Sequence, residues 1–203
     1  MNINKRLPAV LFILIITVLF AACPTAYLNL PTLDDFLTNM IEGKLGGKII
    51  AVMEAENGEL VHLGPWGSPV ILRNSGVASG GAYVKEMSLY HGYVEVTVPD
   101  TVQAGAYSLA LGWSGSSTGL VTVTVNAGKI DEQIIKMNFN RNGEDWDMKD
   151  PQYLTVTAGT SFKPGDKIRV HSGFAGESGT PQSYSGGHIN LDAVYLFVPD
   201  ETE

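Results

Sequence analysis

The chain has 203 residues, of which 44% are hydrophobic and 17% charged, and it contains a single cysteine. This length suits one domain of ordinary size, and one cysteine excludes a disulfide framework within the chain. Lysine and arginine number 13 against 21 acidic residues, which gives a net charge of −8. Because an acidic surface without a basic stripe repels phosphate backbones, we expect no binding of nucleic acid.

The N-terminus has the pattern of an export signal. Two basic residues, Lys5 and Arg6, precede an apolar run over 7–20 and a pair of alanines. The apolar run is shorter than the roughly 20 residues that span a bilayer comfortably. The next residue is Cys23, the only cysteine of the chain. We therefore expect residues 1–22 to be a signal peptide and the mature protein to lie outside the cytoplasm.

The segment Leu19-Phe20-Ala21-Ala22-Cys23 resembles the lipobox of bacterial lipoproteins, with Phe20 where leucine is usual. The resemblance implies that Cys23 is acylated and becomes the mature N-terminus. It also implies a place in the bacterial cell envelope, anchored to the lipid bilayer on the periplasmic face or at the cell surface. The alternatives are a simple secretory signal with a cysteine nearby and an uncleaved N-terminal anchor.

Residues 23–48 are expected to form a tether with one short helix. Within Thr32–Glu42, apolar residues recur at helical spacing and two aspartates stand in the first turn. Glycines between Gly43 and Gly47 are expected to end this helix. We expect it to act as a spacer that packs loosely on the following domain.

From Ile49 onward the apolar pattern changes to the period of β-strands. Short β-rich runs, mostly alternating, are separated by Gly, Pro, Asn and Asp, and no long helix lies between them. This pattern predicts an all-β fold, an antiparallel sandwich or barrel, over 49–199, with a tail at 200–203. The runs are 93–98, 107–111, 120–125, 154–157, 167–170 and 193–198.

Several segments, taken in order, resemble the family 6 and family 35 carbohydrate-binding modules. Met53-Glu54-Ala55-Glu56 resembles their first-strand acidic pair, Gly80–Val84 their Gly-Gly segment, and Ile189–Val194 their last strand. The similarity covers about 50–198 and implies an antiparallel β-sandwich of jelly-roll type that binds an oligo- or polysaccharide. The chain departs from the family at Gly112, where a basic residue is frequent, and at Ala193, where tyrosine is usual.

Glu54 and Glu56 are two residues apart, so on a strand both carboxylates point to one face. Oxygen-rich sites suit Ca²⁺, which takes six to eight oxygen ligands. The resemblance implies a structural calcium held by this pair and by the aspartate of the last strand, which Asp192 matches, with a backbone carbonyl near Ser75. The alternative is a solvated acidic edge.

The resemblance also implies three ligand-binding residues, Tyr83, Trp146 and Asn190. Sugar rings present C–H faces that stack on aromatic rings, while an asparagine amide offers both a donor and an acceptor for hydroxyls. The alternatives are a core tyrosine and a loop anchor. Trp66 and Trp113 also stand in loop-like contexts, where either could extend the aromatic surface.

Catalysis has little support in the sequence. The chain has no His-Glu-x-x-His or P-loop motif, and no two histidines stand at metal-ligand spacing. The acidic residues around Trp146 are those of a solvated turn. We therefore expect a protein that is not an enzyme: an exported, lipid-anchored carbohydrate-binding protein. The alternative function is that of a surface structural or adhesion lipoprotein that uses the same sandwich without binding a glycan.

Overall fold

The computed structural model describes residues 33–62, 70–73, 78–87, 92–115, 119–140, 152–172 and 189–200. The expectations for Cys23, Trp66 and Trp146 lie outside these residues. Two compact units divide the chain, Met1–Leu37 and Thr38–Glu203, and the sandwich belongs to the second. No helix in the described ranges is long and apolar enough to cross a membrane.

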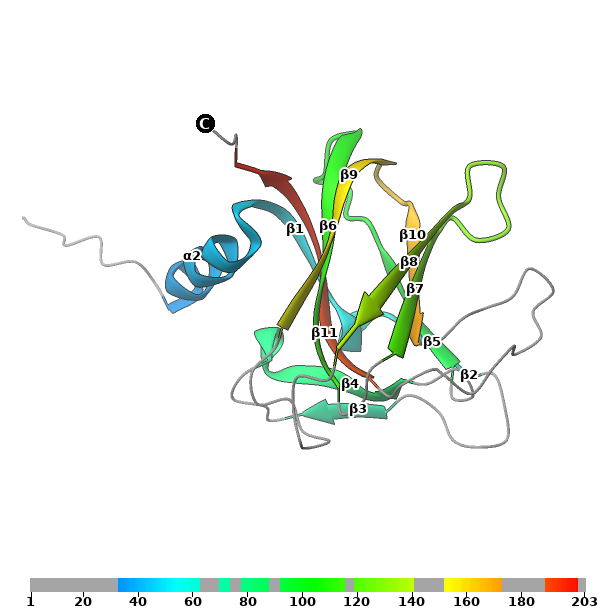
Figure 1. Ribbon diagram of the computed structural model, residues 1–203, viewed down its shortest axis with the longest axis horizontal. Coiled ribbons are helices and arrows are strands. Elements are labelled where there is room, and N and C mark those ends of the chain that lie inside the picture. Colours follow the sequence, from blue (N-terminus) through cyan, green and yellow to red (C-terminus); the bar gives the residue numbers. More distant parts are fainter. Residues whose placement is uncertain are drawn as a thin grey trace, which may run out of the picture. The chain divides into compact units, whose positions relative to one another are not determined.

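The fold is an all-β sandwich of two antiparallel sheets, as the sequence predicts (Figure 1). The six-stranded sheet has the order β3-β4-β11-β6-β9, with β1 also paired to β11, and the five-stranded sheet has the order β2-β5-β10-β7-β8. The elements are α2 (Leu33–Leu45), β1 (Gly47–Glu54), η1 (Ala55–Asn57), β2 (Glu59–His62), β3 (Val70–Arg73), η2 (Ser79–Gly81), β4 (Ala82–Met87), β5 (Gly92–Thr97), β6 (Gly105–Gly115), β7 (Gly119–Val125), β8 (Gln133–Phe139), β9 (Gln152–Phe162), β10 (Lys167–Ser172) and β11 (Ile189–Pro199).

The core lies between the two sheets and is built from alternate residues of their strands. In β5, for example, Val94 and Val96 are buried, while Tyr93 and Glu95 are partly exposed. This alternation follows from the two-residue period of a strand, which turns every second side chain inward. The largest buried side chains of this core include Leu109, Leu111, Phe139, Phe162 and Ile168.

The end of α2 differs from the expectation of a helix that stops before Gly43. The helix runs through Gly43 to Leu45, because one glycine costs an interior helical position only about 1 kcal/mol. It ends at Gly46, which has a φ of 65° and donates its N–H to the Glu42 carbonyl at 2.9 Å. This is the left-handed conformation in which helices commonly end. Strand β1 then begins at Gly47.

A second apolar cluster covers the outer face of the six-stranded sheet. Leu45 and the partly buried Ile41, from the C-terminal half of α2, pack there with Ala193, Tyr195 and Phe197. In addition, the Ile49 backbone N–H donates to a Glu42 carboxylate oxygen at 2.8 Å. The last turns of the helix are therefore attached to the sandwich by apolar contacts and a hydrogen bond.

Candidate functional site

Three segments far apart in sequence meet at one end of β1. Glu54 ends β1 and stands opposite Ala193 in β11, so it lies beside Asp192. Ser79, in the turn before β4, places its Oγ 2.8 Å from Glu54 Oε2 and 3.1 Å from Asp192 Oδ2. The Tyr195 hydroxyl lies 3.4 Å from the same Ser79 Oγ. The structure thus joins the first and last strands through a serine that the sequence analysis did not identify.

Two glycines make room for this cluster. Gly80 has a φ of 61°, and a Cβ there would lie 2.8 Å from Glu56 Oε1 and 3.4 Å from Glu54 Oε2. In β6, a Cβ on Gly112 would lie 3.3 Å from Asp192 Oδ2 and 3.1 Å from a ring carbon of Tyr195. A larger side chain at position 112 would therefore displace the carboxylate. The close approach of Asp192 and Tyr195 therefore favours glycine at position 112.

Burial and mutual repulsion raise the pKa values of the acids. The pKa of Asp192 rises from 3.8 to about 7, because burial disfavours its charge and the charges of Glu54 and Glu56 add to the effect. Hydrogen bonds from the Ser79 backbone and hydroxyl oppose this rise. Burial also raises the pKa of Glu54, and the charge of Glu56 adds to this rise, whereas a hydrogen bond from Ser79 lowers the pKa in part. The cluster therefore favours the uptake of positive charge, as a proton or as a cation.

The fit to a calcium ion is partial. Asp192 is 1% exposed, and its Oδ1 atom is buried without a hydrogen-bond partner among the described residues. Ser79 has one hydroxyl proton to donate, while two carboxylates lie within reach of its oxygen. However, no three His, Cys, Asp or Glu side chains in the described ranges are arranged to hold a metal ion as they stand. Calcium at Glu54, Glu56 and Asp192 therefore stays a prediction.

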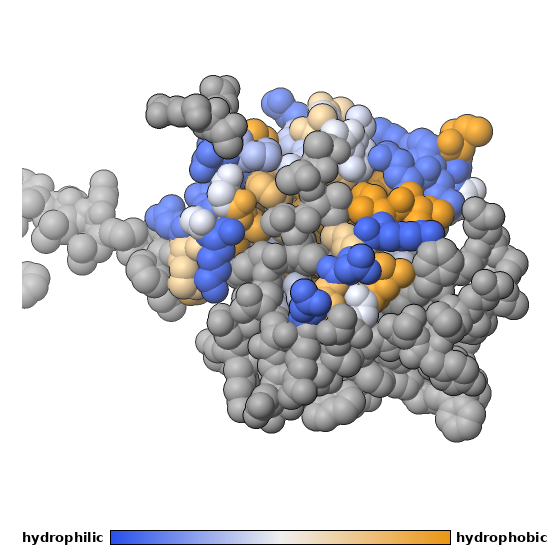
Figure 2. Space-filling view, in the orientation of Figure 1, coloured by the Kyte–Doolittle hydropathy of each residue, from blue (hydrophilic) through white to orange (hydrophobic). Residues whose placement is uncertain are grey.

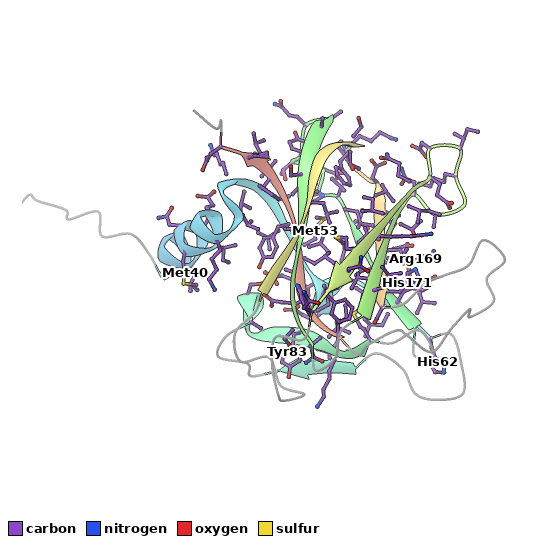
Figure 3. All side chains as sticks on the ribbon, viewed as in Figure 1. Met40, Met53, His62, Tyr83, Arg169 and His171 are labelled. Atoms are coloured by element: carbon purple, nitrogen blue, oxygen red, sulfur yellow. The ribbon has the colours of Figure 1, made fainter. Side chains whose placement is uncertain are left out.

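Both described ligand candidates are buried. Tyr83 lies on β4 (Figure 3) and has 4% of its surface exposed. Asn190, at the start of β11, is 5% exposed. The Asn190 side-chain nitrogen donates to Ser114 Oγ at 3.3 Å. Tyr83 therefore belongs to the packing here, and stacking of its ring on a sugar stays a prediction. Trp146, the third candidate, lies outside the described residues.

Trp113 is a core residue and does not extend an aromatic surface in this structure. It is 4% exposed and meets Phe139 edge to face, with ring centroids 4.9 Å apart and an interplanar angle of 68°. Its indole N–H is buried without a hydrogen-bond partner among the described residues. The sequence context of Gly112-Trp113-Ser114 suggested a loop, but all three residues lie within β6.

The outer face of the five-stranded sheet carries a second group of titratable residues. Arg169 and His171 both lie on β10 (Figure 3). The Arg169 guanidinium lies 4.0 Å from the ring centroid of Tyr93 and 3.1 Å from Glu95 Oε2. His171, two residues along β10, is 7% exposed. Burial lowers its pKa from 6.5 to about 4, and the charge of Arg169 adds to this. The histidine is therefore neutral at ordinary pH, with the opposite pKa shift to Asp192.

A third polar cluster fixes the turn after β7. Asn126 has a φ of 52° and is 2% exposed, and its side-chain nitrogen donates to Asp166 at 2.9 Å and to Asp131 at 3.1 Å. Its Oδ1 accepts the Lys167 backbone N–H at 3.1 Å. Lys163 Nζ bridges the two aspartates, at 2.8 Å from Asp131 and 3.2 Å from Asp166. Because every polar atom of this asparagine has a partner, we assign the cluster to stability.

Comparisons with known proteins give partial likenesses. No protein-family model matches the chain, and no curated protein matches it. Among solved structures, a family 35 carbohydrate-binding module from Clostridium thermocellum is 23% identical with a TM-score of 0.49, covering 73% of this chain and 99% of that one. An exo-beta-1,3-galactanase from Phanerochaete chrysosporium with beta-1,3-galactotriose is 23% identical with a TM-score of 0.49, covering 72% of this chain.

A third solved structure is a cycloalternan-forming enzyme from Listeria monocytogenes in complex with a pentasaccharide substrate. It is 19% identical with a TM-score of 0.49, over 71% of this chain. The chain spans only 29% of the galactanase and 12% of the cycloalternan-forming enzyme. These are similarities of fold over part of each enzyme, and they assign no family to the chain.

Proposed function

We propose that this chain is an exported, lipid-anchored and non-catalytic carbohydrate-binding protein whose sandwich is tied by a structural Ca²⁺. One observation carries the proposal: Glu54 and Asp192 meet at Ser79, although 138 positions separate them in the chain. The motifs that resemble carbohydrate-binding modules predicted this meeting of the first and last strands.

The role of the cation follows from the chemistry of the cluster. Glu54, Glu56 and Asp192 repel one another when all are ionised, which the raised pKa values of Glu54 and Asp192 express. A bound Ca²⁺ would neutralise this repulsion, and it prefers oxygen ligands such as these carboxylates and nearby backbone carbonyls. Since the acids come from the first strand with its following turn and from the last strand, cation binding would tie the beginning of the domain to its end.

The proposed glycan contacts divide between stacking and hydrogen bonding. Trp146 supplies the apolar face, because a tryptophan among acidic residues covers little of its surface unless a ligand lies on it. Asn190 supplies polar atoms from β11, two residues before Asp192, so that cation binding and ligand binding act on the same strand. Tyr83, which is 4% exposed, must turn outward to stack on a sugar.

A glycan array of the full chain in detergent, with calcium and then with chelator, tests the proposal. We expect binding to neutral oligosaccharides that Trp146→Ala abolishes and that chelation weakens. The matched control is Trp113→Phe, which changes a buried tryptophan of the core and should leave the glycan profile unchanged. A folded protein that binds no glycan in either condition would contradict the proposal.

One observation favours the alternative of a structural or adhesion lipoprotein. Tyr83 and Asn190 are both buried, and Asn190 bonds to Ser114 within the sandwich. If this alternative holds, isothermal titration of the folded chain will detect no glycan binding, either with calcium or with chelator. Glycan binding that Trp146→Ala abolishes would contradict the alternative.

A further inference from the structure

A groove of about 470 Å³ runs between the edges of the two sheets; Glu54 lines it and Asn190 does not. Its walls come from β1 and the following turn on one side and from β5 and the start of β10 on the other. The part of the groove that decides its chemistry is lined by Val52, Met53, Glu59, Thr97, Pro99 and Lys167. Val52 is 40% exposed, so an apolar side chain stands at the rim.

Both walls present backbone groups that no described strand pairs. The Asp200 N–H donates to the Gly46 carbonyl, so this is a hydrogen-bonded pair of the β1–β11 ladder. Hydrogen-bonded and non-hydrogen-bonded pairs alternate along β11, which makes Tyr195 and the opposite Val52 a non-hydrogen-bonded pair. The N–H and C=O of Val52 therefore point away from β11. After β5, the Val98 N–H donates to the Asp166 carbonyl. The preceding residue, Thr97, stands opposite Lys167 as a non-hydrogen-bonded pair, so its N–H and C=O point away from β10. On its other side β5 pairs with β2 only as far as Glu95. The groove therefore lies between two free strand edges.

The charge of the groove is negative. Glu54, Glu59 and Glu95 line it, against the single ammonium of Lys167, which donates to Thr97 Oγ1 at 2.8 Å. Glu59 stands directly opposite Glu95 in the β2–β5 pair, an unfavourable placement of like charges. Arg169 pairs with Glu95, whereas no described residue forms an ion pair with Glu59.

This charge decides among the possible occupants of the groove. Once the proposed signal peptide with Lys5 and Arg6 is removed, residues 24–32 carry no charge, and 201–203 carry two glutamates, so neither of these segments complements it. A second copy of the chain has a net charge of −8 and is also a poor match. On the face shown in Figure 2, apolar and hydrophilic side chains of the described residues lie next to one another. A basic segment of another protein fits best.

We propose that this groove binds an extended, lysine- or arginine-bearing segment of a partner protein by strand addition. The main chain of the segment bonds to the free edge at Val52 or Thr97, and a cationic side chain of the segment reaches Glu59, which has no ion pair among the described residues. Strand addition supplies affinity through main-chain hydrogen bonds and specificity through alternate side chains. The proposal uses none of the residues assigned to glycan binding.

Fluorescence anisotropy with a labelled octapeptide of alternating lysine and valine tests this site on the full chain in detergent. We expect saturable binding that weakens as salt is raised and is absent for the same peptide with glutamate in place of lysine. Val52→Pro removes an outward N–H without breaking a ladder bond and should weaken binding about fivefold. Val52→Ala, which keeps the N–H, is the matched control and should bind within about twofold.

Glu59→Gln provides a second variant that keeps the fold even if proline is not tolerated. It should weaken peptide binding and flatten its salt dependence. Amide exchange should slow at Val52 or Thr97 when the peptide binds. The proposal is overturned if the octapeptide does not bind, if Glu59→Gln binds it unchanged, or if only a deacetylated amino-sugar oligomer binds and the peptide does not.

Discussion

The opposite pKa shifts of Asp192 and His171 predict that their effects on stability cancel in mildly acidic solution. Asp192 has a folded pKa of about 7 against 3.8 for the free group. Its contribution is therefore fully present below the unfolded pKa and is lost as the pH rises through about 7. His171 has a folded pKa of about 4 against 6.5. Its contribution is present above 6.5 and is lost as the pH falls toward 4.

The magnitudes follow from the shifts. Each pKa unit corresponds to about 1.4 kcal/mol, so Asp192 removes about 4 kcal/mol of stability between pH 4 and 7 in the absence of a bound cation. His171 adds about 3 kcal/mol between pH 4 and 6.5. Because the two slopes are opposite over the shared range, the contributions of Asp192 and His171 to the free energy of unfolding should largely offset each other there. Single substitutions should expose the slopes separately.

Asp192→Asn and His171→Gln are the informative variants, since both replace a titrating group by a neutral one of similar size. Measured by urea denaturation with chelator between pH 4.5 and 7.5, Asp192→Asn should gain stability relative to the unsubstituted chain as the pH rises. His171→Gln should lose stability over the same range. Differences from the unsubstituted chain remove the contributions of the other acids. Parallel pH profiles for all three proteins would refute the reasoning.

Three further predictions concern the anchor, the glycine beside the acids, and the turn after β7. Metabolic labelling with a palmitate analogue in a bacterial host should mark the chain and not Cys23→Ser, and equal labelling would contradict acylation. Gly80→Ala should lower stability by about 2 kcal/mol through backbone strain and contact with Glu56, more than Gly128→Ala, where strain acts alone. Asn126→Ala should lower the free energy of unfolding in urea by about 3 kcal/mol, because it leaves the buried partners of this side chain without hydrogen bonds, and Asn126→Gly should lower it less. A loss below about 1 kcal/mol would show that the turn does not depend on this network.

The sequence predicted the strands best where one face is buried and the other meets solvent. In β5 and β7 the alternation of valine with polar residues is regular, and both strands form as predicted. Strand β8 was missed, because Ile134 is 54% exposed and adjoins Ile135, which breaks the alternation. The helix end was also misplaced, since the left-handed cap falls on one glycine among several and tertiary contacts of Leu45 select it.

The candidate site was predictable only in part. Motif order indicated that Glu54 and Asp192 approach each other, and the structure places both against Ser79. The roles of Ser79 and Tyr195 could not be read from spacing, because they arise where turns and strands distant in sequence pack together. The burial of Tyr83 likewise depends on which face of β4 meets the rest of the sandwich, and a single tyrosine after two glycines does not decide this.

The most direct test of the central claim is isothermal titration of the full chain in detergent with the best glycan of the array, with calcium and with chelator. In calcium, we expect the unsubstituted chain to bind with micromolar to millimolar affinity, about −8 to −4 kcal/mol. Asp192→Asn in calcium should bind as weakly as the unsubstituted chain does with chelator. Chelator should have no further effect on this variant. Glycan affinity that is the same with calcium, with chelator and in Asp192→Asn would contradict a cation-tied binding site.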